Sequence, residues 1–213
     1  RRPAFPDDKI ELAKVGIRRS IASRNDEMGS VLNRVATASV FGKDSPYARI
    51  PEYATLEAIT REDCVKFHQL CYSPDRAILV VYGDFKSADM KLRVTQAFGD
   101  WAKSASKLPA MPAMPASHQT RLVFAPKDDV TQSGVLLCQL GFKNDDPQVA
   151  DLDVLEQALG GGFQSRLFNK VRTQRGLAYA TGASAGGGFF RPGVFTAFSL
   201  TRNDSVLTAM QLV

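Results

Sequence analysis

An arginine and a tyrosine seven positions apart are the residues of this sequence best suited to recognise a peptide backbone. Arg172 falls near the end of a short predicted helix, Gly176 allows a turn, and Tyr179 begins the next predicted strand. A guanidinium offers planar donors to a carbonyl oxygen, and a phenol hydroxyl donates toward the same place. If both side chains project into one cleft, they form a substrate-binding site. The alternative, which the residues alone favour, is a surface ion pair for Arg172 and a half-buried sheet position for Tyr179.

A second group of reactive side chains shares one face of another predicted helix. Cys64, His68 and Cys71 are spaced i, i+4 and i+7, which places all three on the same side. Thiolate and imidazole are both zinc ligands. However, cysteine also packs as a small hydrophobe, and structural zinc sites usually take their ligands from separate turns. The packing interpretation is therefore favoured, and we predict no metal ligand in this chain.

The common catalytic motifs are absent from the sequence. It contains no Gly-x-Ser-x-Gly nucleophile motif and no His-x-x-Glu-His, and its two histidines are His68 and His118. The triple glycine at 160–162 lacks the spacing of a phosphate-binding loop and follows a predicted helix rather than a strand. We expect it to end that helix and to lie close to another backbone segment. The sequence thus predicts no catalytic residue and no cofactor within the chain.

The elements that must position these residues mix amphipathic helices with short apolar strands. Apolar spacing predicts helices at 7–23, 29–41, 60–72, 87–101, 148–159, 165–174 and from 203 onward. Continuous or alternating apolar runs predict strands at 77–82, 120–125, 131–142, 179–187 and 193–201. Because the later strands follow one another directly, the order indicates an α+β fold with two partial layers of mixed sheet packed with helices.

Composition bounds the kind of protein further. The chain has 213 residues, 44% of them apolar, with 27 basic and 22 acidic side chains and three cysteines. These values exclude wholesale disorder and a disulfide framework. The net charge of +5 is not gathered in a long basic block, so nucleic acid is not an expected partner. No apolar run approaches the roughly 18 residues of a membrane span.

Two features of the chain suggest how it is divided. Residues 104–119 carry a proline at every third position, at Pro109, Pro112 and Pro115, which is typical of an extended linker. The sequence also opens without an initiator Met or signal peptide and stops at Val213 inside a helical pattern. We therefore expect a piece of a longer protein.

Two ordered sets of short motifs run along nearly the whole chain. The first set is Ser45–Tyr47, Leu56–Asp63, Phe67–His68, Tyr72–Asp75, Val80–Phe85 and Phe98–Trp101. The second set is Leu159–Gly162, Ser165–Phe168, Arg172 and Arg175–Tyr179. In order and spacing these motifs resemble the pitrilysin/insulinase family of inverzincin zinc metallopeptidases. The first set is similar to the segment that follows the active site, and the second to the start of the next domain.

The resemblance implies repeated α+β domains like those of the mitochondrial-processing-peptidase-like metallohydrolases, closing as a clamshell over an unfolded peptide. Residues 1–103 would be the second half of the N-terminal domain, 104–119 the linker, and 120–213 the first half of a non-catalytic domain. The resemblance also implies that Arg172 and Tyr179 reach the peptide near the zinc ion.

The zinc ligands of the family are not expected here. The resemblance places the inverted zinc motif upstream of Arg1 and the distal Glu ligand on the first helix, where the favoured register puts Arg18, Arg19 or Ser20. A shifted register would use Glu11. We therefore expect a non-catalytic region of such a peptidase, or of its inactive partner subunit, that binds extended peptide and closes the proteolytic chamber.

Two alternatives stay open. The chain could belong to an active zinc metallopeptidase whose motif lies upstream, or to a structural subunit without peptide binding. The resemblance allows zinc in the full-length parent or in a partner domain or subunit that carries the zinc site. The family resemblance alone suggests the periplasm as a compartment.

Overall fold

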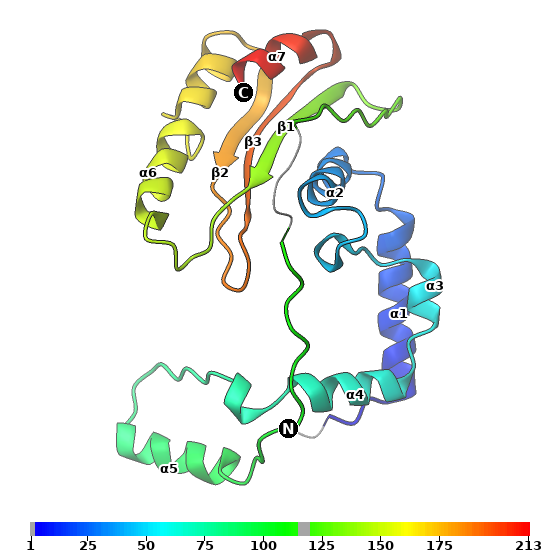
Figure 1. The fold of residues 1–213 in the computed structure, drawn as a ribbon, viewed down its shortest axis with the longest axis vertical. Coiled ribbons are helices and arrows are strands. Elements are labelled where there is room, and N and C mark those ends of the chain that lie inside the picture. Colours follow the sequence, from blue (N-terminus) through cyan, green and yellow to red (C-terminus); the bar gives the residue numbers. More distant parts are fainter. Residues whose placement is uncertain (1–2, 115–119) are drawn as a thin grey trace. The chain divides into compact units, whose positions relative to one another are not determined.

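The computed structural model describes residues 3–114 and 120–213, and it confirms the α+β class (Figure 1). The α-helices are α1 (Asp7–Ala22), α2 (Met28–Phe41), α3 (Tyr53–Glu57), α4 (Arg61–Cys71), α5 (Ser87–Phe98), α6 (Val149–Leu159) and α7 (Val206–Leu212). The strands are β1 (Gln132–Leu140), β2 (Ala178–Ser184) and β3 (Val194–Arg202). Short 3-10 turns are η1 (Pro46–Ala48), η2 (Pro74–Arg76) and η4 (Asn203–Ser205), and η3 (Phe168–Thr173) is π-helical.

The chain forms two compact units. Unit 1 comprises Arg1–Ala22 and Pro51–Met111, and unit 2 comprises Ser23–Ile50 and Pro112–Val213. One division falls inside the predicted proline-rich linker, whose residues 104–114 form no helix or strand. Pro115 and His118 lie outside the described residues. The grouping of 23–50 with unit 2 was not predicted, and the assignment of 1–103 and 120–213 to two family domains stays a prediction.

Unit 1 contains helices whose ends the sequence specifies. Asp7 and Asp8 lie in the first turn of α1, where carboxylates favour the positive end of the helix dipole. At the start of α4, the Thr60 hydroxyl accepts from the Asp63 N–H at 3.2 Å, and the Asp63 carboxylate accepts from the Thr60 N–H at 2.9 Å. This reciprocal pair is the predicted capping box.

The prediction of a strand at 77–82 was wrong, because that segment pairs with nothing in the described part of the chain. It forms no ladder, and its apolar side chains are exposed to solvent, with Val80 82% exposed. The prediction at 120–125 was wrong for the same reason. Apolar composition indicates that a segment suits a sheet, but only a neighbouring strand supplies the hydrogen-bonded ladder.

Unit 2 is built on a three-stranded sheet in the order β1-β3-β2, with every pair antiparallel. The register places Ala197 of β3 between Leu137 of β1 and Ala183 of β2. The core lies where η3, α6 and α7 cover this sheet. Its residues are Leu167, Val171, Ala178, Ala183 and Ala197, with Leu159, Leu177, Phe195, Leu212 and Val213 packed against them.

Helix α2 packs against β1 within the same unit. A Cβ added at Gly134 of β1 would meet the Leu32 side chain at 2.2 Å, so the absence of a side chain there allows the close approach. Gly42, at a φ of 87°, follows the end of α2 as predicted.

The hairpin loop between β2 and β3 presents two adjacent phenylalanines to solvent. Phe189 and Phe190 are both strongly exposed, so they belong to the hairpin loop and not to the core of unit 2. The loop itself is held in place, since the Arg191 guanidinium lies 4.5 Å from the ring centroid of Phe41 and 4.9 Å from that of Tyr47.

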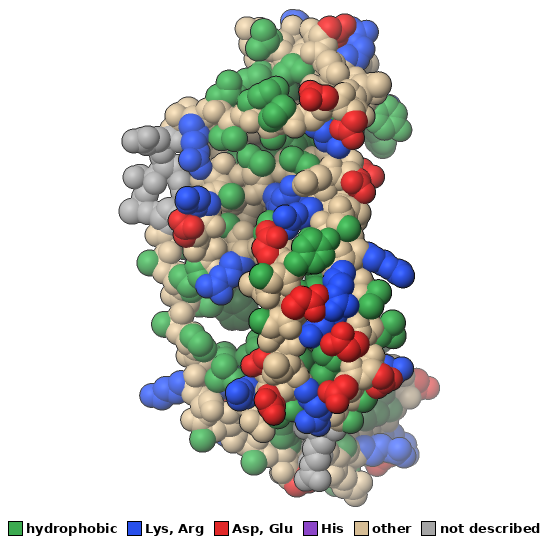
Figure 2. Space-filling view, turned by 90° about the vertical axis from the view of Figure 1, so that its right-hand side faces the viewer, with side chains coloured by type: hydrophobic (Ala, Val, Ile, Leu, Met, Phe, Trp, Pro, Cys, Tyr) green, Lys and Arg blue, Asp and Glu red, His purple; other side chains and the backbone are tan. Residues whose placement is uncertain are grey.

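The surface that carries α1 and α3 in unit 1 mixes charges of both signs (Figure 2). Acidic and basic side chains alternate there rather than forming a patch of one sign. Of the helices in the described residues, none is both long enough and apolar enough to cross a membrane.

Candidate functional site

The helical turn that carries Arg172 is anchored in the core of unit 2 through the neighbouring residue Val171. Val171 is fully buried, and its carbonyl accepts from the Leu177 N–H at 3.0 Å. The Arg172 carbonyl accepts from the Gly176 N–H at the same distance. Gly176 adopts a φ of 61°, a left-handed conformation that glycine takes without steric cost. The connection from η3 to β2 is therefore a short, hydrogen-bonded turn.

The structure brings the two predicted site residues together. The guanidinium carbon of Arg172 lies 5.5 Å from the ring centroid of Tyr179 and 4.8 Å from that of Phe168. Both distances are within the range of cation–π attraction. Tyr179 points outward from β2 and is 73% exposed.

The alternative of a surface ion pair for Arg172 and a half-buried position for Tyr179 does not describe the geometry. Among the described residues, no carboxylate forms an ion pair with Arg172, and the Arg172 guanidinium makes no hydrogen bond. Tyr179 is exposed rather than half-buried. An exposed hydroxyl and a set of N–H donors thus lie beside one another with their hydrogen-bonding capacity unused by this part of the protein.

Two phenylalanines extend the cluster, and the sequence reasoning missed both. Phe168 lies four positions before Arg172, and its ring meets that of Phe163 edge-on, with the centroids 5.0 Å apart. Phe163 is largely exposed. The signal was available, because residues four apart on a helical turn are neighbours. Together the side chains offer hydrogen-bond donors flanked by apolar ring surface.

The triple glycine after α6 allows the end of this helix to lie close to β2 of the sheet. A Cβ at Gly160 would lie 2.0 Å from the backbone nitrogen of Ala183 in β2. The prediction that this stretch packs against another backbone is therefore confirmed at Gly160. By contrast, a Cβ at Gly162 would meet nothing within 4 Å. The Glu156 side chain of α6 accepts from the Ala185 N–H at 2.7 Å and ties the same helix to the end of β2.

The described residues do not fit a zinc ion. No group of three or more His, Cys, Asp or Glu side chains is gathered anywhere in the described ranges. On α1, Arg18 forms two hydrogen bonds to the carboxylate of Glu57, at 2.6 and 2.7 Å. Glu11 forms ion pairs with Lys14 and Arg18, at 3.3 and 3.7 Å. Glu11, the carboxylate that a shifted register would use, thus faces two cations.

The Arg18–Glu57 pair also shifts the titration of its members. The hydrogen bonds from Arg18 lower the pKa of the Glu57 carboxyl. The same hydrogen bonds raise the pKa of the Arg18 guanidinium. Because both groups are exposed, the pair stabilises unit 1 only modestly.

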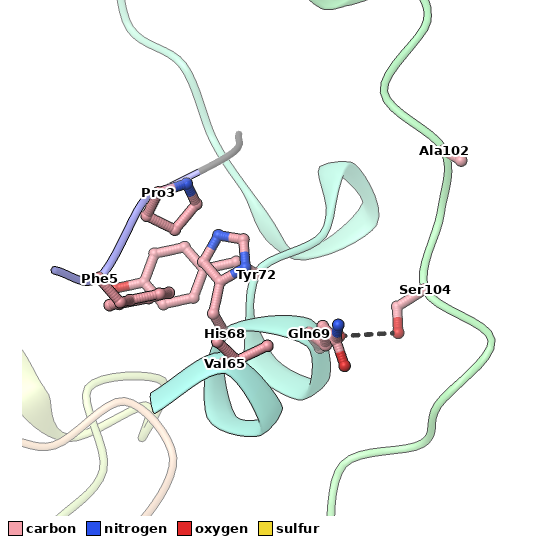
Figure 3. Close-up of a pocket in the computed structure, with 8 residues that line it drawn as sticks. All are labelled: Pro3, Phe5, Val65, His68, Gln69, Tyr72, Ala102 and Ser104. Carbon is pink, nitrogen blue, oxygen red and sulfur yellow. Dashed lines mark hydrogen bonds between the residues drawn. The ribbon is translucent and has the colours of Figure 1, made fainter. Parts of the chain in front are cut away.

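A separate cavity of about 340 Å³ lies within unit 1 (Figure 3). Its lining residues come from the segment before α1, from α4 and its end, and from the segment after α5. They are Pro3, Phe5, Val65, His68, Gln69, Tyr72, Ala102 and Ser104. Here the His68 ring stacks on the Tyr72 ring at 5.0 Å, so His68 is part of an aromatic group rather than of a metal site with Cys64 and Cys71.

Comparison with known proteins shows which sequences and which fold this chain is similar to. Residues 58–213 match the family model described as the peptidase M16 inactive domain. A protein of Mycobacterium leprae named as an uncharacterized zinc protease is 32% identical over 186 residues, which cover 81% of this chain and 39% of that protein. A similarly named protein of Streptomyces coelicolor is 26% identical over 97% of this chain and 46% of its own length. The chain thus spans less than half the length of these relatives.

A solved structure shares the fold. The crystal structure of a peptidase M16 inactive domain from Pseudomonas fluorescens superposes with a TM-score of 0.85 at 23% identity, over 99% of this chain and 51% of that one. At this identity the likeness concerns the fold alone.

Proposed function

Because the chain belongs to the peptidase M16 family, we propose that it is a non-catalytic region of a zinc peptidase, or of such a peptidase's inactive partner subunit. In this role it binds extended peptide and helps to close the chamber in which a zinc-bearing domain or subunit cleaves. Arg172 and Tyr179 hold the peptide backbone.

One observation carries this proposal: the Arg172 guanidinium lies within cation–π distance of both the Phe168 and the Tyr179 rings, with its donors unpaired among the described residues. The two rings limit the directions in which the guanidinium can point. Its N–H groups can then donate to a peptide carbonyl oxygen, and the Tyr179 hydroxyl can donate to the same or the next carbonyl. Backbone carbonyls are common to all peptides, so this contact would tolerate many sequences.

The non-catalytic assignment draws support from α1. In the favoured register of the family resemblance, an arginine occupies the region of the distal zinc ligand. That arginine, Arg18, donates two hydrogen bonds to the carboxylate of Glu57. The donor set on this helix therefore suits an ion-pair network rather than a divalent cation.

A second candidate function is an active zinc metallopeptidase of which this chain forms one part. The names of the Mycobacterium leprae and Streptomyces coelicolor relatives favour it. In that case the zinc ligands come from residues outside this chain, and the Arg172–Tyr179 pair keeps the same role. A structural subunit without peptide affinity is the third possibility.

Zinc analysis combined with peptide binding separates these functions. We expect the full-length parent protein, purified without a partner subunit, to contain no stoichiometric zinc and to bind a fluorescently labelled, unstructured peptide without cleaving it. Stoichiometric zinc with chelator-sensitive cleavage would contradict the non-catalytic assignment. Absence of any peptide binding would favour the structural role.

A further inference from the structure

The cavity of unit 1 has walls that suit a flat, uncharged ring (Figure 3). The His68 and Tyr72 rings stack on each other with an angle of 16° between their planes. The Phe5 ring meets the His68 ring edge-on, with centroids 6.0 Å apart. A further ring that enters the cavity can therefore make edge or offset contacts, which are the favoured arrangements of aromatic side chains.

The charge of the lining narrows the class of ligand. Among the described residues, no Asp, Glu, Lys or Arg lines the cavity, so none of them offers a counter-charge to an anion or a cation there. Polar groups are nevertheless present. The Gln69 side-chain amide makes no hydrogen bond to the described residues. The Ser104 hydroxyl, by contrast, already donates to the backbone carbonyl of Gln69 at 3.3 Å. A ring with one hydrogen-bonding substituent matches this lining.

The wall formed by Phe5 is held in place by a specific contact. The Arg61 guanidinium donates to the carbonyls of Ala4 and Phe5, both at 3.0 Å. Phe5 itself has a φ of 47°, which is unusual for a residue with a side chain and persists only where the surroundings enforce it. Ala4 and Phe5 are thus held against the start of α4.

The volume sets the size of the ligand. About 340 Å³ is at the lower end of small-molecule sites, and it accommodates one ring and its substituent rather than a nucleotide or a large cofactor. We propose that this cavity is a binding site for a neutral aromatic ring that carries a polar substituent, as in a phenol. The ring could belong to a tyrosine side chain within a peptide or to a free small molecule. This site is separate in chemistry from the Arg172–Tyr179 pair.

Chemical-shift titration of the 213-residue chain tests the proposal. The probes are N-acetyl-tyrosinamide, a five-residue peptide with a central tyrosine between glycines, and N-acetyl-leucinamide. In a His118→Gln variant, a labelled histidine side chain reports on His68 alone, since the sequence has only these two histidines. We expect saturable shifts of the His68 ring signals with both tyrosine probes and none with the leucine probe. Tighter binding of the peptide would identify a peptide side chain as the ligand, and equal affinity a free aromatic.

A matched pair of substitutions locates the site. Tyr72→Leu removes the stacked ring and should weaken tyrosinamide binding about threefold to tenfold. Tyr53→Leu changes an exposed tyrosine of the same unit that does not line the cavity, and it should leave the affinity unchanged. Should Tyr72→Leu fail to fold by circular dichroism, Gln69→Ala supplies the same test at an exposed helical position. Absence of saturable shifts, equal shifts with the leucine probe, or equal affinities for the cavity variant and Tyr53→Leu would each overturn the proposal.

Discussion

The guanidinium of Arg172 and the ring of Tyr179 lie 5.5 Å apart, although one belongs to a helical turn and the other to a strand. The hydrogen bonds through Gly176 and Leu177 bring the two elements together. This arrangement leaves a cation and a phenol side by side at the start of β2. It is the structural basis of the peptide-binding role proposed for this chain.

Phe168 should act as a positioning residue for Arg172. We predict that Phe168→Leu weakens the binding of a labelled, unstructured peptide about twofold to fivefold, because the guanidinium loses the ring beneath it. Phe168→Tyr keeps the ring and should restore the affinity. The measurement is fluorescence anisotropy at constant ionic strength.

Phe163→Leu is the control for that prediction. Phe163 contacts the Phe168 ring and forms no cation–π contact with Arg172, so its loss should change peptide affinity less. If Phe168→Leu binds as tightly as the unmodified chain, Phe168 does not position the guanidinium.

Gly160 and Gly162 form a matched pair for a stability test. Gly160→Ala would place a methyl group against the backbone of β2, and we expect a loss of about 1–3 kcal/mol in the free energy of unfolding, as for other overpacked sites. Gly162→Ala has open space and should stay close to the unmodified chain. Urea denaturation followed by circular dichroism measures both. Equal midpoints for the two variants would show that the backbone beside Gly160 accommodates a methyl group and would contradict the overpacking argument.

The Arg18–Glu57 pair predicts a pH dependence with a definite sign. The pKa of Glu57 is lowered in the folded protein by hydrogen bonds from Arg18, whereas a glutamate in the unfolded chain has a pKa of about 4.3. The contribution of the pair is therefore fully present above the unfolded pKa and is lost as the pH falls through the folded pKa.

Comparison with Glu57→Gln isolates this contribution. The unmodified chain should have the higher urea midpoint at pH 7, and the difference should shrink toward zero as the pH falls below about 4. The difference should also shrink in 1 M salt, because the pair is exposed. A difference that stays constant between pH 7 and pH 3 would argue against an ionic contribution.

Local signals in the sequence were sufficient for most helices and for the hairpin of β2 and β3. The Thr60–Asp63 capping box fixes the start of α4 through contacts within four residues. Likewise, Gly42 marks the end of α2. Such features depend on neighbours along the chain, so the pattern of residue types is enough to predict them.

Features that depend on distant partners could not be predicted in the same way. The apolar run at 77–82 has the composition of a strand, yet no described segment provides the neighbouring backbone. The cavity beside His68 combines segments from three places in the chain, and its stacked rings were not foreseen. At the candidate site, the family resemblance, rather than spacing alone, pointed to Arg172 and Tyr179, and the rings of Phe168 and Phe163 were recognised only from the structure.

The affinity of the chain for an unstructured, labelled peptide tests the central claim most directly. Arg172→Ala should weaken binding at least about tenfold, as expected for the loss of a hydrogen bond from a charged donor. Tyr179→Phe removes one hydroxyl and should weaken it about twofold to tenfold. Arg175→Ala, which removes a nearby exposed arginine, controls for net charge and should bind as the unmodified chain does. Unchanged affinity in both Arg172→Ala and Tyr179→Phe would contradict the account.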